Sequence, residues 1–224
     1  MIFFRQLGSG VWDVVLGIVA LLMALFVAIP FHEFAHAFVS YSLGDRSAGT
    51  HNRLTINPLA HIDWMGLLCL FAFGFGWGKP VTVDPRYYKD PKNGMVWTAF
   101  AGPVMNFILG FVCIFFYYLI LGFIPSLYYT GIGSFILDLL AQTAYLSIGL
   151  GIFNCIPIPP LDGSKVLFSF LDEDKYFRLI QGTPVLSIIF IAILFSGVIN
   201  APIYHLESSM VSLFSNISMK IMGL

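Results

Sequence analysis

Charged residues and cysteines are scarce in this sequence. Only 10% of its 224 residues are Asp, Glu, Lys or Arg, whereas about a quarter of the residues of a typical soluble domain are charged. The formal net charge is −1, so the chain as a whole has no electrostatic attraction to nucleic acid. The three cysteines lack the paired spacing of a disulfide framework or a thiolate zinc site: Cys69, Cys113 and Cys155. We expect these thiols to pack as small hydrophobic residues.

Hydrophobic residues, in contrast, make up 58% of the chain, and the mean hydropathy is +0.86. This composition is typical of a polytopic membrane protein. Because a membrane-spanning helix needs about 20 apolar residues, the chain has room for about four or five spans and for no separate soluble domain. We therefore predict an all-α polytopic membrane protein that forms a single integral-membrane domain over residues 1–224.

Four apolar stretches are predicted to cross the membrane as helices. They are residues 10–43, 95–122, 132–156 and 184–199. Residues 202–224 are ambiguous between an interfacial helix and a weak span. Residues 65–75 are too few for a comfortable span, so we predict a re-entrant or interfacial segment there.

Shorter elements are expected near the cytoplasmic side of these spans. Residues 53–58 and 81–84 have the composition and alternation of short strands. Residues 154–163 contain too many prolines to remain helical. A short amphipathic helix is predicted over residues 164–171, followed by a polar loop through residue 183.

The stretch of residues 30–45 contains the pattern His-Glu-x-x-His, at His32, Glu33 and His36. On a helix the two histidines share one face, so both imidazoles can reach one metal ion, and Glu33 can reach a metal-bound water. This is the pattern of zinc hydrolases. The preceding residues 14–29 are apolar and uncharged, which places the motif inside a membrane, where ionisable groups are costly and indicate a functional site.

A catalytic zinc ion generally has three protein ligands. The candidates for the third ligand are Asp162, Asp138, Asp63, His51, His61, His205 and Glu207. Asp162 has the best context, because it lies in an irregular proline-rich segment beside a span. Asp63 and His61 are the strongest rivals, since residues 57–63 could fold back near the motif, although turn chemistry is their favoured interpretation. Asp138 falls near the far end of its predicted helix.

Positive charges are concentrated on two connections of the chain. They are Arg46, Arg53, Lys79, Arg86, Lys89 and Lys92 on one, and Lys165, Lys175 and Arg178 on the other. If residues 65–75 do not cross, two spans separate the connections, so both lie on one side and the uncharged turn at residues 122–131 lies opposite. The positive-inside rule makes the charged side cytoplasmic. We expect a multi-pass protein of the plasma membrane with its active site toward the cytoplasm.

Three motifs together resemble the site-2 protease family of intramembrane zinc metalloproteases. They are His32-Glu33-x-x-His36, Ala101-Gly102-Pro103-x-x-Asn106 and Asn154-x-x-Pro157-x-Pro159-x-Leu161-Asp162-Gly163. The chain looks most similar to short prokaryotic members without PDZ or nucleotide-sensing domains. The resemblance implies one catalytic Zn²⁺ ion, ligated by His32, His36 and Asp162. It also implies that Glu33 is the general base and that Asn154 helps to hold the substrate or the reaction intermediate.

The function implied by this resemblance is hydrolysis of peptide bonds within or next to transmembrane segments of membrane proteins. The expected partners are transmembrane protein substrates and the lipid bilayer, with no nucleic acid and no nucleotide. Phe73 stands where a phosphate-binding loop needs Gly, and Pro80 stands where it needs Ser or Thr. This agrees with the expectation that no nucleotide binds.

Three other functions are weighed against this one. A zinc protease that processes prenylated peptides would need a downstream intramembrane glutamate ligand, and the chain offers no suitable one. A metal transporter would need ligands along a path across the bilayer, and the far half of the chain offers only Asp138 and Gln142. A non-catalytic homologue that binds transmembrane helices would not need Glu33 as a base.

Overall fold

The computed structural model describes residues 11–47, 53–73, 76–180, 189–190, 192–194 and 196–223. Within these residues the regular structure is helical, and three long helices dominate it: α1 (Val11–Ser42), α5 (Pro91–Phe123) and α6 (Gly131–Asn154). Each contains a stretch long and apolar enough to cross a membrane. The prediction of an all-α polytopic membrane protein is confirmed, and the three helices lie where three of the spans were predicted.

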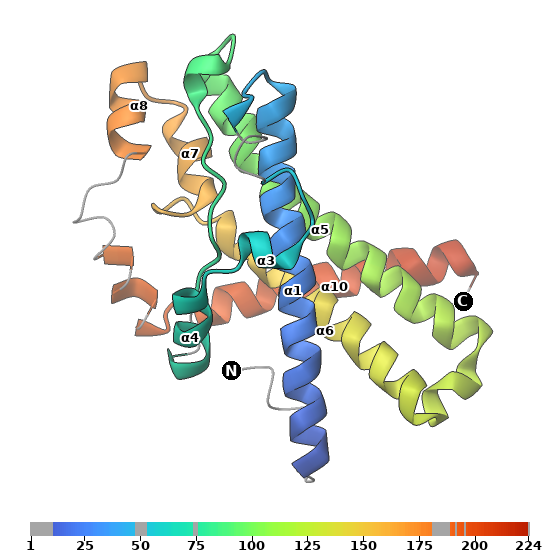
Figure 1. The fold of residues 1–224 in the computed structure, drawn as a ribbon. Coiled ribbons are helices and arrows are strands. Elements are labelled where there is room, and N and C mark those ends of the chain that lie inside the picture. Colours follow the sequence, from blue (N-terminus) through green and yellow to red (C-terminus); the bar gives the residue numbers. More distant parts are fainter. Residues whose placement is uncertain are drawn as a thin grey trace.

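Helices α5 and α6 form a hairpin that packs against α1 (Figure 1). The short 3-10 helix η2 (Pro125–Tyr129) connects the two. Helix α10 (Asn200–Met222) runs across this hairpin and contacts both of its helices. A small residue allows the close approach of α5 to α6, because a Cβ atom at Gly110 would lie 2.5 Å from Cγ1 of Ile148.

The ends of the hairpin helices follow from local sequence. Asp90 caps the start of α5, where its side chain accepts a hydrogen bond from the Asn93 amide. Thr130 caps α6 in the same way through the Gly133 amide. Helix α6 ends at Asn154, directly before the proline-rich segment, as predicted.

Two short helices occupy the connection after α1. They are α3 (Pro58–His61) and α4 (Trp64–Phe73). The Asp63 carboxylate accepts hydrogen bonds from the amides of Met65 and Gly66, which satisfies the start of α4. At ten residues, α4 is too short to cross a bilayer, in agreement with the segment predicted there.

The two predicted strands are wrong. Residues 53–58 and 81–84 form no strand, and the β-type pairing in the described part of the chain is a single bridge between Ile62 and Gly78. The Asn57 side chain caps α3 instead, and the proline after it begins that helix. In residues 81–84, the amides of Val81 and Asp84 donate to side chains of other segments, as described below.

The chain after α6 forms α7 (Asp162–Phe168) and α8 (Glu173–Ile180). Helix α7 corresponds to the amphipathic helix predicted over residues 164–171. The polar loop predicted after it is wrong, because α8 forms there and buries the Tyr176 side chain completely. Part of the predicted span 184–199, namely residues 184–188, 191 and 195, lies outside the described residues.

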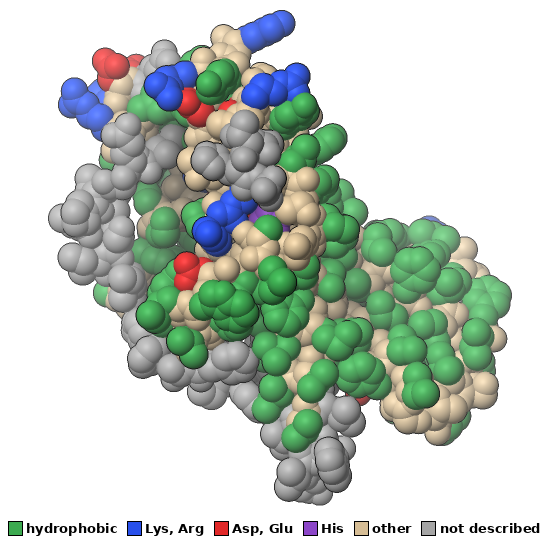
Figure 2. Space-filling view, in the orientation of Figure 1, with side chains coloured by type: hydrophobic (Ala, Val, Ile, Leu, Met, Phe, Trp, Pro, Cys, Tyr) green, Lys and Arg blue, Asp and Glu red, His purple; other side chains and the backbone are tan. Residues whose placement is uncertain are grey.

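Charged and apolar side chains separate on the surface. Lys, Arg, Asp and Glu gather around η1 (Pro85–Tyr87), α8 and the end of α1, whereas hydrophobic side chains dominate the opposite part (Figure 2). On α5 the exposed apolar residues include Ile108, Val112 and Phe116. An exposed apolar stripe on such a helix is suited to contact with lipid.

Candidate metal centre

Three buried side chains from distant parts of the chain meet beside α5. His32 and His36 lie one turn apart on α1, and Asp162 is the first residue of α7. The Nε2 atoms of the two histidines are 3.0 Å apart. Oδ2 of Asp162 lies 3.3 Å from Nε2 of His32 and 3.1 Å from Nε2 of His36. Within the described residues, no other three His, Cys, Asp or Glu side chains offer ligand atoms this close together.

The spacing and chemistry of this group fit zinc. Ligand atoms about 2.0–2.2 Å from a tetrahedral zinc ion lie roughly 3.3–3.6 Å from one another, so the observed separations need only a small outward adjustment. Two imidazole nitrogens and a carboxylate oxygen converge on one point, with exposed fractions of 5–7% for the three residues. A cation at that point stabilises lone pairs that would otherwise repel one another. The predicted metal group is therefore assembled.

Helix α5 orients His36 by a hydrogen bond and lies directly against both imidazoles. Nδ1 of His36 lies 2.6 Å from the Thr98 carbonyl oxygen, which can only accept a hydrogen bond. Nδ1 therefore carries the proton, and the lone pair of Nε2 faces the metal position. One turn further along α5, a Cβ atom at Gly102 would lie 2.4 Å from Nε2 of His36 and 2.6 Å from Cε1 of His32. Only glycine lets α5 pass this close to both imidazoles.

Asp162 has a second charged partner. Nζ of Lys165, one turn along α7, donates to Oδ1 of Asp162 at 2.9 Å, which leaves Oδ2 directed at the histidines. Burial alone would raise the pKa of the Asp162 carboxyl, but the positive charge that His36 carries when it is doubly protonated and the Lys165 ammonium hold that pKa well below its usual range. Asp162 is therefore a carboxylate, the form that ligates a metal.

Glu33 lies on the wall of the same cavity as the metal group. Its Oε2 atom accepts a hydrogen bond of 3.0 Å from the Val81 amide. Val81 belongs to an irregular segment, residues 79–84, which we call the strap. At the other end of the strap, the Asp84 amide donates to Oδ2 of Asp45 at 2.9 Å. The strap is thus tied to α1 at Glu33 and just beyond the end of α1 at Asp45.

A buried polar cluster links the strap to the metal group. The Ser40 hydroxyl donates to Asp45 at 2.8 Å and lies 2.7 Å from the Tyr88 hydroxyl. The Tyr88 hydroxyl is 3.2 Å from Oγ1 of Thr98, whose carbonyl binds His36. Hydrogen bonds therefore connect the strap anchor at Asp45 to a metal-ligand candidate through side chains that are almost fully buried.

The rival ligands lie elsewhere. Nε2 of His61 lies 2.7 Å from the Thr55 carbonyl oxygen, and Asp63 caps α4. Both residues therefore have the local turn roles that the sequence favoured. Asp138 precedes Asn154 by 16 residues on α6, which places it about 24 Å along the helix. His205 and Glu207 lie on α10, and His51 lies outside the described residues.

Asn154 and Cys155 follow one another at the end of α6. The Asn154 amide donates to the Leu150 carbonyl at 2.9 Å, and its side chain lines the cavity of the metal group. Cys155 is exposed, which corrects the expectation that it packs as a core residue. Cys113 is buried as expected, and Cys69 is partly buried.

Sequence reasoning missed four contributors to this site: Thr98, Gly102, Lys165 and the strap. A glycine within a membrane helix is a signal for close helix approach, and a lysine three residues after Asp162 is a signal for an ion pair on a helix. Thr98 and Val81 act through backbone atoms, which every residue possesses. No side-chain pattern could have identified them.

Comparison with known proteins places the site in a family context. Residues 129–197 match the profile of peptidase family M50. YwhC of Bacillus subtilis, named as a proposed zinc metalloprotease, is 32% identical over 204 residues, which cover 88% of this chain and 91% of that protein. MJ0611 of Methanocaldococcus jannaschii, named in the same way, is 33% identical over 150 residues, which cover 65% and 68%. No solved structure was found to match this chain.

Proposed function

This chain belongs to peptidase family M50, the site-2 proteases, and is a membrane zinc metalloprotease, and we propose that it cleaves peptide bonds within or next to transmembrane segments of membrane-protein substrates. The observation that carries the proposal is the position of the metal group on α1. His32 and His36 lie within a stretch that is apolar and long enough to cross a membrane. A peptide bond can reach them only at membrane depth.

We assign the zinc ligands to His32, His36 and Asp162. These side chains would hold a zinc ion, whose Lewis acidity would polarise a carbonyl oxygen and lower the pKa of a water molecule. Glu33 accepts the proton from that water and passes it to the leaving amine as the general base and then the general acid. The hydrogen bond from the Val81 amide holds the Glu33 carboxylate at the cavity wall and leaves its other oxygen free for this transfer.

Asn154 holds the substrate or the intermediate beside the metal group. Its side chain lines the cavity that Glu33 and the metal group share, and its amide can exchange the local Leu150 carbonyl for a substrate group. The chain acts as a single integral-membrane domain over residues 1–224 in the plasma membrane. The basic residues that precede α5 and follow α6 support an active site toward the cytoplasm.

Purified protein with a single-span model substrate tests this function. We expect wild type to cleave the substrate, Glu33→Gln to keep its zinc and lose at least 10²-fold in kcat/KM, and Asp162→Asn to lose zinc. Asp63→Asn is the matched control, because it alters a carboxylate that caps α4 outside the metal group, and it should keep both zinc and activity.

Two results would contradict the assignments. Zinc bound at wild-type stoichiometry and affinity by Asp162→Asn would remove Asp162 from the ligand set. Failure of zinc-loaded wild type to cut any single-span substrate, together with cleavage of soluble peptides, would overturn the proposed substrate class.

A further inference from the structure

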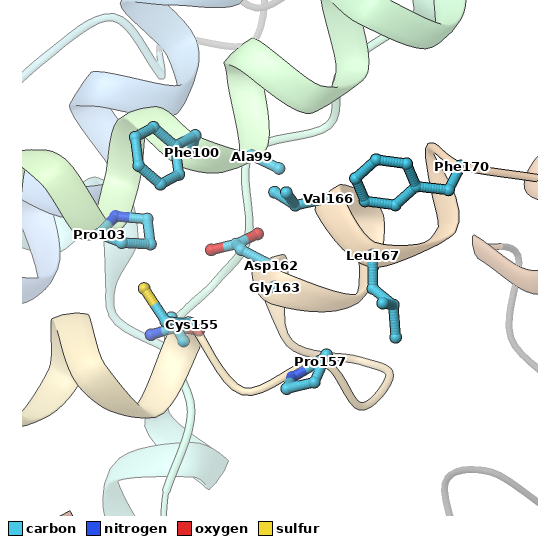
Figure 3. A pocket seen from close by; sticks show the side chains of 11 residues that line it. Ala99, Phe100, Pro103, Cys155, Pro157, Asp162, Gly163, Val166, Leu167 and Phe170 are labelled. Atoms are coloured by element: carbon cyan, nitrogen blue, oxygen red, sulfur yellow. The ribbon is translucent and has the colours of Figure 1, made fainter.

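An apolar pocket lies on the other side of Asp162 from the strap. Helix α5 forms one wall with Ala99, Phe100 and Pro103, and α7 together with Phe170, two residues past its end, forms the other (Figure 3). The α7 side chains are Val166 and Leu167, and Phe170 follows. Asn154, Cys155 and Asp162 are the lining residues that carry side-chain polar or sulfur atoms. The remainder of the lining is apolar.

This pocket is continuous with the metal group. Asp162 and Asn154 line both the apolar pocket and the cavity that contains His32, Glu33 and His36. One residue of extended chain spans about 3.3–3.6 Å. A substrate carbonyl at the metal position therefore brings the side chain next to the cleaved bond within reach of the pocket.

The rim of the pocket is apolar and exposed. Phe100 on α5 and Leu167 on α7 are 45% and 46% exposed, and Phe170 is 86% exposed. The base is tight, since Ala99 is only 1% exposed. Exposed apolar side chains beside a membrane-crossing helix face lipid, so the pocket opens to the phase in which a transmembrane substrate lies.

We propose that this pocket is the subsite for a bulky apolar side chain, such as Leu or Phe, next to the cleaved bond of the substrate's transmembrane segment. The inference rests on the proposed function. It assigns specificity to the walls that Val166 and Leu167 form against Ala99. An acidic side chain is rejected because the lining offers it no cation and Asp162 would repel it.

A substrate series tests the subsite. The cleavage position in one single-span substrate is mapped by mass spectrometry, and the residues on its two sides are then varied among Ala, Leu, Phe and Asp. For wild type we expect Leu or Phe at one of the two positions to exceed Ala in kcat/KM by about tenfold or more, and Asp to be the poorest. Equal kcat/KM values for Leu and Ala at both positions would overturn the proposal.

Two variants change the pocket in opposite directions. Val166→Phe narrows it and should bring the Leu-to-Ala ratio close to one. Leu167→Ala widens it and should raise the Phe-to-Leu ratio. Ile108→Phe is the matched control, because it also introduces Phe but at an exposed position of α5 outside the pocket. It should leave both ratios unchanged. Ratios that stay at wild-type values in zinc-loaded Val166→Phe and Leu167→Ala would contradict the subsite.

A binding measurement separates this inference from the proposed function. Cys155 is exposed and lines the pocket, so a thiol-alkylating reagent reports on occupancy. In zinc-loaded Glu33→Gln, a transmembrane peptide with Leu at the critical position should slow alkylation of Cys155 at least fivefold relative to its Ala counterpart. Such protection without cleavage by wild type would support the pocket and overturn the proposed function. Cleavage by wild type with no Leu-specific protection would support the proposed function and overturn the pocket as the subsite.

Discussion

At Gly102 the backbone of α5 lies directly against the imidazoles of the metal group. We predict that Gly102→Ala displaces the imidazoles, because its Cβ atom would lie 2.4 Å from Nε2 of His36. The backbones of two packed helices can move only slightly to relieve this overlap. Zinc affinity should fall by about 10–100-fold, the range seen when the support of a ligand is lost, as measured by competition with a chelator.

Gly131→Ala is the control for this change. Gly131 begins α6, and a Cβ atom there would contact nothing within 4 Å, so zinc affinity should match that of wild type. Equal zinc affinity in Gly102→Ala and Gly131→Ala would show that α5 does not limit the position of the histidines.

Individual residues of the site differed in how far sequence could predict them. His32, Glu33 and His36 were predictable because a spacing of four residues on one helix is a local property. Asp162 remained one of several candidates on residue-level reasoning, since its approach to α1 depends on how distant segments pack. Gly102 was recognised only as part of a motif, and its role beside the histidines was missed for the same reason.

Among the elements, the strap depends on one buried carboxylate. Asp45 accepts hydrogen bonds from Ser47, from the Asp84 amide and from Ser40. Burial alone would raise the pKa of the Asp45 carboxyl, but these hydrogen bonds outweigh burial and lower the pKa below its ordinary value of 3.8. The carboxylate thus stabilises the fold above the ordinary pKa, and this contribution is lost as pH falls through the lower, folded-state pKa.

Asp45→Asn should therefore reveal a pH-dependent difference in stability. At pH 7 we expect the variant to be less stable than wild type by about 1–3 kcal/mol, measured by unfolding in mixed detergent micelles. The difference should shrink as pH is lowered below about 4. Asp174→Asn, at an exposed position on α8, should match wild type throughout, and a difference for Asp45→Asn that does not change with pH would refute the role of the charge.

The same elements explain which parts of the fold could be predicted. Long apolar helices were predicted within a few residues, because their length is set by the bilayer. The strand at residues 53–58 was wrong because Asn57 caps α3, and the strand at residues 81–84 was wrong because Glu33 and Asp45 bind backbone amides that strand pairing would need. Helix α8 was missed since its stability comes from the burial of Tyr176, a contact that the polar composition of the segment conceals.

For the whole molecule, the charge distribution predicts on which side of the membrane each connection lies. Tyr129 in the α5–α6 connection is 86% exposed, and Lys175 on α8 lies in the basic connection after α6. In a cysteine-free background, Tyr129→Cys should react with an impermeant thiol reagent added to intact cells. Lys175→Cys should react only after the cells are opened. Labelling of both from outside would contradict the proposed cytoplasmic orientation.

At this scale, composition alone was sufficient for the class of protein. A chain with 10% charged residues and 58% hydrophobic residues cannot form a soluble surface around its core. The packing of α10 across the hairpin could not be anticipated, because residues 202–224 suit either an interfacial or a spanning helix and only contact with α5 and α6 decides where they lie.

The members of the metal group lie far apart in the sequence, which has a consequence for biosynthesis. Asp162 comes 126 residues after His36, so at about 5–20 residues per second the ribosome delivers it roughly 6–25 s after the histidines. Throughout this interval the inserted portion offers both histidines and Glu33 but not Asp162, the third member of the metal group. We therefore expect a nascent chain to be inert toward the other membrane proteins around the translocation machinery until Asp162 has joined the two histidines.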